Sequence, residues 1–145
     1  MIIQTFAAFV GTICFSIIFS VPKNQYLYCG FTGAIGWLCY LILVSFHLPT
    51  VFATFFAAIV LTVLSRVFAI RRRVPVTVFL ITGIFPLVPG AGLYYTTYHF
   101  FMNQPNIAAS KGIETIKIAV AIALGIMFIF AIPQKLLKWG ASSKK

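Results

Sequence analysis

Residues 76–101 read VTVFLITGIFPLVPGAGLYYTTYHFF, an apolar run long enough for a membrane helix that carries helix breakers near its centre. Pro86 and Pro89 each remove a backbone donor and clash with the preceding turn, while Gly90 and Gly92 tolerate unusual backbone dihedrals. Backbone groups freed inside a bilayer must be satisfied by protein or by a water-filled cavity. The run therefore predicts a transmembrane helix broken near mid-membrane, an arrangement that forms substrate sites in secondary transporters.

Hydroxyl-bearing side chains follow the break. The restarted half-helix would present its first amides near residues 90–92, where they favour an anion such as a carboxylate. Tyr94 and Tyr98 share one helical face at i and i+4, and Thr97 beside them offers a hydroxyl group. The alternative interpretation is a simple proline kink followed by interfacial tyrosines. The residues predicted here to shape the break or to contact substrate are Pro86, Pro89, Gly90, Gly92, Tyr94 and Thr97.

Four other apolar runs surround this one, and each approaches the roughly 20 residues that cross a bilayer. Short polar or proline-containing breaks separate them, and no linker or fixed-period repeat divides the chain. The sequence therefore predicts an all-α integral membrane protein with five transmembrane helices, the fourth broken by Pro and Gly, in a single domain over residues 1–145. The four other runs cover residues 2–21, 29–46, 50–70 and 111–132.

Composition supports the membrane class and excludes several kinds of enzyme. Of the 145 residues, 61% are hydrophobic and 8% are charged, and Glu114 is the one acidic residue against eleven Lys and Arg. A single carboxylate excludes paired-carboxylate catalysis, a carboxylate-bound metal ion and a Ser/His/Asp triad within this chain. Cys14, Cys29 and Cys39 have no CxxC spacing, so we interpret them as small buried hydrophobic residues and not as a redox or zinc site. We expect no enzyme activity, no cofactor, no metal site and no nucleic-acid partner.

The positions of the basic residues predict the orientation. With the N-terminus outside, nine of the eleven Lys and Arg fall on the cytoplasmic side, as the positive-inside rule requires. If the broken fourth run dipped into the membrane and returned, four spans would result, with the triple arginine and the lysine tail on opposite sides. No basic residue precedes the first apolar run, so we expect it to be retained as a span. The nine residues are Lys23, Arg66, Arg71, Arg72, Arg73, Lys135, Lys138, Lys144 and Lys145.

Small residues mark helix faces that another helix can approach closely. Gly30, Gly33 and Gly36 leave one strip of the second run almost without side chains. Membrane helices use such strips for packing, because lipid provides no hydrophobic drive for their association. Lining a substrate path is the alternative. We also expect some of these faces to meet a partner subunit or a second copy of the chain.

Two charges are candidates for function. Arg66 lies inside the third run, where it must snorkel, pair or act as a functional charge. Glu114 has Lys111 three residues before it and Lys117 three residues after it, so all three share one helical face. Glu114 is either the residue that couples transport to protons or part of a solvated helix start capped by Ser110.

Three segments of the chain match a known sequence pattern: RRRVPVTVF at residues 71–79, PLVPGAGLY at residues 86–94 and GIET at residues 112–115. With them the chain resembles the threonine/serine exporter family, specifically its small-subunit domain, which forms the C-terminal half of fused exporters. The resemblance implies a multi-pass protein of the bacterial plasma membrane that works with a larger membrane subunit. It also implies export of small amino acids or dicarboxylates, driven by the proton gradient. The positive-inside rule, applied above, predicts that its C-terminus is in the cytoplasm.

Two other functions remain open from sequence. A non-transporting scaffold or assembly subunit would use the same glycine faces without a broken helix. A self-sufficient homo-oligomeric small transporter would need a membrane-embedded carboxylate, and Glu114 at a helix start would fit that role poorly.

Overall fold

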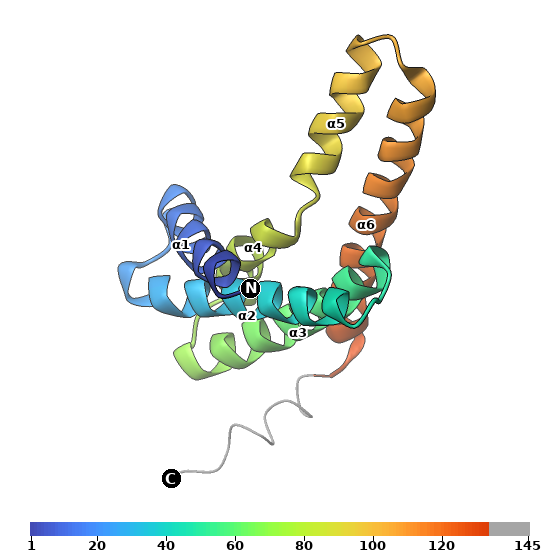
Figure 1. Ribbon diagram of the computed structural model, residues 1–145. Helices are drawn as coiled ribbons and strands as arrows, with labels where there is room; N and C mark the ends of the chain where they lie inside the picture. Colours follow the sequence, from blue (N-terminus) through green and yellow to red (C-terminus); the bar gives the residue numbers. More distant parts are fainter. Residues whose placement is uncertain (134–145) are drawn as a thin grey trace.

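The computed structural model describes residues 1–133, and all their regular structure is helical (Figure 1). This confirms the all-α prediction. The four lysines of the predicted cytoplasmic tail, at 135, 138, 144 and 145, lie outside the described residues. The elements in chain order are α1 (Ile2–Ile18), the short 3-10 helix η1 (Lys23–Gln25), α2 (Tyr26–Ser45), α3 (Thr50–Arg72), α4 (Val76–Ile84), the 3-10 helix η2 (Phe85–Leu87), α5 (Gly90–Phe101) and α6 (Pro105–Ala131).

Three or four of these segments have the length and composition of a membrane span. They are Lys23–Ser45, α3 and α6, with α4, η2 and α5 together giving a fourth if the bent pair is one span. α1 is apolar but has only 17 residues. The predicted count of five spans therefore depends on α1 as well as on the bent pair.

Helix α6 begins earlier than the sequence suggests. Its first residue is Pro105, which suits the first turn because its missing amide hydrogen would have no partner there. The prediction that Ser110 caps this helix is wrong, since Ser110 lies within α6 and Gln104 is the N-cap residue. Glu114 consequently lies well inside the helix.

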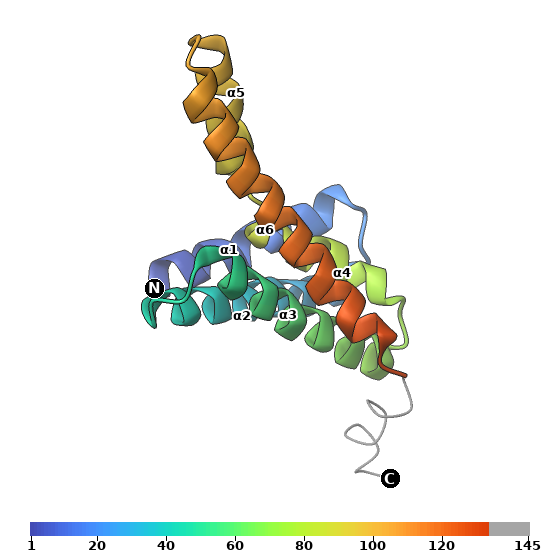
Figure 2. The ribbon, with the colours of Figure 1, turned by 90° about the vertical axis from the view of Figure 1, so that its right-hand side faces the viewer.

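Helices α1 to α4 pack together into one body (Figure 2). α6 crosses this body and packs against α3. A Cβ atom on Gly36 would lie 2.9 Å from Leu61 Cδ1, and one on Gly125 would lie 2.8 Å from the carbonyl oxygen of Phe55. Gly33 lies directly against the Thr12 side chain of α1. The glycine strip of α2 therefore serves close packing on both sides, as predicted for membrane helices.

Hydroxyl groups in the body bond within their own helices. Thr12 donates to the carbonyl oxygen of Ala8 at 2.7 Å, and Thr62 donates to that of Ala58 at 2.7 Å. This i to i−4 bond lets Thr and Ser occupy an apolar interior without a partner helix. Buried polar side chains on α1 and α3 therefore do not themselves indicate a site.

Residues 90–115 form an arm that projects from this body (Figure 1). It consists of α5 and the first part of α6. α5 has no buried residue, and α6 is the one helix of residues 1–133 with which it packs extensively. Gly92 lies against Thr115, and a Cβ atom on Gly112 would lie 3.3 Å from Thr96 Cγ2, so small residues on both helices hold the hairpin closed.

Candidate functional site

The break between α4 and α5 lies where the prolines predict it. α4 ends at Ile84, Pro86 lies in η2, and Pro89 is the N-cap residue of α5. The axes on the two sides of the break differ in direction by 49°. Neither Gly90 nor Gly92 has a positive φ, so the break does not use the backbone freedom that glycine allows. Gly92 is instead needed for the close contact with Thr115.

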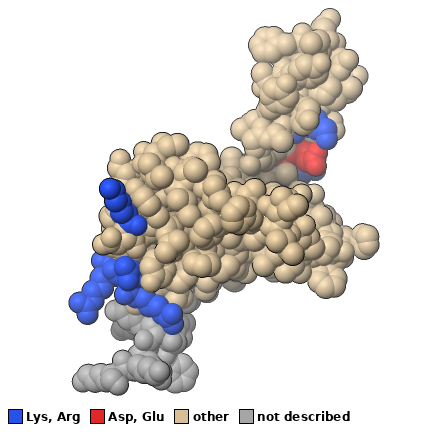
Figure 3. Space-filling model, turned by 60° about the vertical axis from the view of Figure 1, so that its left-hand side comes forward, with Lys and Arg blue, Asp and Glu red and all other residues tan. Residues whose placement is uncertain are grey.

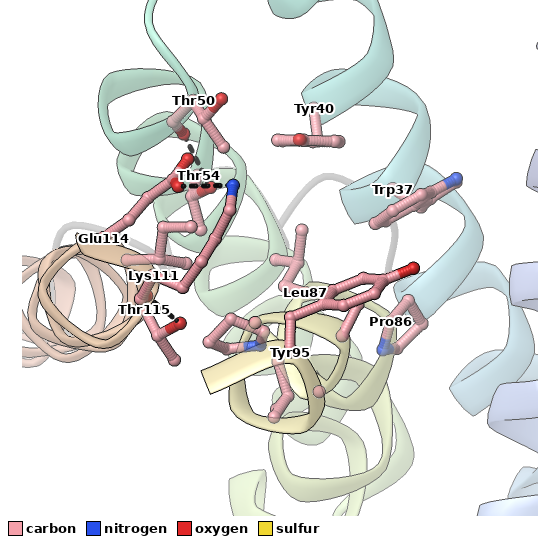
Figure 4. Close-up of a pocket in the computed structure, with 16 residues that line it drawn as sticks. Trp37, Tyr40, Thr50, Thr54, Pro86, Leu87, Tyr95, Lys111, Glu114 and Thr115 are labelled. Carbon is pink, nitrogen blue, oxygen red and sulfur yellow. Dashed lines mark hydrogen bonds and ion pairs between the residues drawn. The ribbon is translucent and has the colours of Figure 1, made fainter. Parts of the chain in front are cut away.

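A cavity of about 320 Å³ opens beside this break (Figure 4). Its size is at the lower end of small-molecule sites, which suits a small ligand. Four helices and the break itself contribute to its wall. The lining residues are Trp37 and Tyr40 of α2, Thr50 and Thr54 of α3, residues 86–92, Tyr95 of α5, and Lys111, Glu114, Thr115 and Ile118 of α6.

One side of the cavity carries an ion pair. Lys111 Nζ lies 3.4 Å from Glu114 Oε2, and the two side chains are 48% and 52% exposed. This is the single ion pair found within residues 1–133. Thr54 and Thr115 donate their hydroxyl hydrogens to carbonyl oxygens of their own helices, so their oxygens remain available only as acceptors (Figure 4).

The structure places the predicted break residues at the cavity but not the predicted hydroxyl residues. Pro86, Pro89, Gly90 and Gly92 all line it, whereas Tyr94 and Thr97 do not. Their contact with substrate stays a prediction. Tyr94 is 63% exposed and stacks on Tyr98 with ring centroids 6.2 Å apart. Thr97 donates to the carbonyl oxygen of Leu93 at 3.0 Å.

Tyr95 is the tyrosine of α5 that lines the cavity, and sequence reasoning missed it. Adjacent residues of a helix point about 100° apart, so Tyr94 and Tyr95 cannot occupy the same face. The i, i+4 spacing correctly paired Tyr94 with Tyr98, but nothing in it shows which face of α5 meets the protein. Trp37 and Tyr40 were missed because they belong to another helix.

Arg66 lies away from this cavity and is 3% exposed. Its Nη1 donates to the carbonyl oxygen of Ile129 and, at 2.9 Å, to that of Ile132, while its guanidinium lies 5.6 Å from the ring centroid of Phe130. The last carbonyl groups of a helix have no partner within it and attract cations. Arg66 therefore lies outside the cavity and binds the C-terminal end of α6, and a role for its charge in translocation stays a prediction.

Comparison with known proteins decides the family. The sequence profile described as threonine/serine exporter, ThrE, matches residues 4–132. The chain belongs to the threonine/serine exporter family. With its apolar helices, this membership indicates a multi-pass membrane protein, in a family of transporters and not of enzymes.

Two relatives of this exporter family member are much longer proteins, and one of them is described as an exporter. A probable threonine/serine exporter of Mycobacterium tuberculosis is 24% identical over 128 residues, covering 88% of this chain and 24% of that protein. An uncharacterized protein of Haemophilus influenzae is 33% identical over 89 residues, covering 61% of this chain and 30% of that protein. The chain thus spans less than a third of the length of either relative. No solved structure matches it.

Proposed function

We propose that this chain is the small membrane subunit of a secondary exporter that acts with a larger membrane subunit in the bacterial plasma membrane. Its substrates are small amino acids such as threonine and serine, or dicarboxylates. The observation that carries the proposal is the broken helix, whose interruption opens onto a cavity lined by an ion pair. Family membership supports the same conclusion.

Five spans with the N-terminus outside are part of this proposal. A bend of 49° lets α5 continue in the general direction of α4, whereas a re-entrant loop would need a near reversal. The helical stretches Val76–Leu87 and Gly90–Phe101 each rise about 18 Å at 1.5 Å per residue. Together they suffice for a hydrocarbon core about 30 Å thick even when bent.

The basic residues support this orientation. Arg72 Nε donates to Gln25 Oε1 at 3.2 Å, which joins the α1–α2 connection to the C-terminal end of α3. Figure 3 shows basic side chains gathered at one end of the body and a separate acidic and basic group at the base of the arm. Because Thr50 begins α3 and Arg72 ends it, the cavity lies toward the end of α3 opposite the arginines.

A larger partner is supported by the arm and by the relatives. The side chains of Leu93, Tyr94, Phe100 and Phe101 are 57%, 63%, 69% and 80% exposed, so one helix of the chain has hardly any protein around it. The exporter of Mycobacterium tuberculosis contains much sequence beyond the matched part. We infer that a larger membrane subunit, equivalent to that additional sequence, packs against this chain in the assembled exporter.

The test is efflux from cells that lack this gene, the gene of the larger subunit, or both. The cells are preloaded with dipeptides that release threonine and serine, and succinate efflux is followed in parallel. We expect each deletion to abolish the same efflux and only co-expression of both genes to restore it. Transport by the larger subunit alone would support the scaffold alternative, and transport by this chain alone would support a homo-oligomeric transporter. Unchanged efflux of all three compounds would contradict the proposal.

A further inference from the structure

We propose that Lys111 and Glu114 form a recognition site for zwitterionic α-amino acids, with Glu114 binding the α-ammonium group and Lys111 the α-carboxylate. This inference rests on the proposed export function and narrows its substrate class. It excludes dicarboxylates as the preferred substrate of the cavity.

The ion pair is loose enough to open. Charge-assisted N–H···O bonds are usually 2.7–2.9 Å long, whereas Lys111 Nζ and Glu114 Oε2 are 3.4 Å apart. Both side chains are about half exposed and both line the cavity beside the break. A zwitterion entering between them would replace this one contact with two, without adding net charge to the cavity.

The charge inventory discriminates against a dicarboxylate. Glu114 is the one acidic side chain in the whole sequence, so it is the one carboxylate side chain here that an ammonium group can meet. A dicarboxylate would use Lys111 but would bring its second negative charge toward Glu114 or toward the aromatic wall. Like charges in contact are a common source of specificity because the repulsion rejects the wrong ligand.

Glu114 also lies at the boundary of two cavities. Together with Thr50 it lines both the cavity at the break and a neighbouring, more open one of about 700 Å³ that includes Lys117. In the cavity at the break, which is the inner of the two, the rings of Trp37, Tyr40 and Tyr95 form an aromatic wall (Figure 4). An ammonium group bound to Glu114 would therefore lie between the two spaces, with aromatic faces available to a cation on the inner side.

Threonine counterflow by the chain co-expressed with its larger subunit tests this site. Counterflow exchanges labelled for unlabelled substrate without net proton movement, so it reports binding and passage rather than coupling. We expect unlabelled serine to support the exchange and succinate not to. Glu114→Gln and Lys111→Gln should each lower exchange about tenfold or more, the effect of losing one charge-assisted bond. Lys23→Gln, which removes a charge at the other end of the body, is the matched control.

A charge swap separates recognition from a folding defect. The double variant Lys111→Glu/Glu114→Lys keeps the pair, and we expect it to recover part of the exchange at equal membrane levels. Normal counterflow in Glu114→Gln would overturn the proposal and leave Glu114 a coupling role. Succinate exchange in preference to threonine would also overturn it while leaving the exporter function intact. If the wild type moves neither compound, the proposed function fails as well.

Discussion

A single buried arginine links the ends of two helices that are distant in sequence. Arg66 of α3 donates to the carbonyl oxygens of Ile129 and Ile132 at the end of α6. In lipid these carbonyl groups have no water to bond, so a positively charged donor satisfies them effectively. The buried charge of Arg66 therefore stabilises the crossing of α3 and α6.

Replacing Arg66 tests this structural role. We expect Arg66→Leu to lower stability by about 1.5–3 kcal/mol, because hydrogen bonds from a charged donor are lost. Arg66→Lys should lose less, since it keeps the charge and one donor direction. The measurement is thermal aggregation in detergent followed by size-exclusion chromatography. Arg71→Leu, at an exposed position near the end of the same helix, is the control, and an equal loss in both variants would contradict the assignment.

At the scale of elements, small residues set which helices approach each other. Gly33 brings α2 against Thr12 of α1, Gly36 brings it against Leu61 of α3, and Gly92 brings α5 against Thr115 of α6. Hydropathy alone does not distinguish these helix faces, because both lipid and protein are apolar. Van der Waals fit between the helices decides them.

Alanine at two glycines of neighbouring helices should have effects of opposite sign. Gly33→Ala places a methyl group on the Thr12 side chain, and we expect a loss of about 1–3 kcal/mol from overpacking. Gly11→Ala in α1 meets nothing within 4 Å, and it should gain about 0.5–1 kcal/mol because alanine is the better helix former. Thermal stability of the purified variants measures both. Equal effects on stability would contradict the close contact between Gly33 of α2 and Thr12 of α1.

At the scale of the whole molecule, charge separates the two ends of the body. Arg72 at the end of α3 contacts the α1–α2 connection, and the Lys111–Glu114 pair lies near the other end of α3. This arrangement fits a cavity that faces away from the cytoplasm. The proposed topology of five spans requires in addition that the broken helix crosses the membrane completely.

Cysteine labelling of intact cells tests that crossing. In a variant without Cys14, Cys29 and Cys39, we expect Asn103→Cys to react with a membrane-impermeant maleimide and Arg73→Cys to react only after permeabilisation. Ser45→Cys, at the end of α2 next to its connection to α3, should also react in intact cells. It reports the outer face independently of the broken helix. Labelling of positions 73 and 103 from the same side would show that α4 and α5 form a re-entrant loop.

The sequence by itself determined the class of the protein and the position of its break. Long apolar runs dictate membrane helices, and Pro86 and Pro89 act through their own backbone, so these features need no information from distant residues. The i, i+3 spacing likewise placed Lys111, Glu114 and Lys117 on one helical face, although it did not show which lysine pairs with Glu114.

Only the tertiary structure decided which face of α5 meets the cavity and which residues of other helices join it. Tyr95 lines the cavity while Tyr94 does not, and Trp37 contributes from α2. The partners of Arg66 are also set by the crossing of α3 and α6 rather than by local spacing. These features depend on how helices pack in an apolar solvent, where shape complementarity and not hydropathy selects the contacting faces.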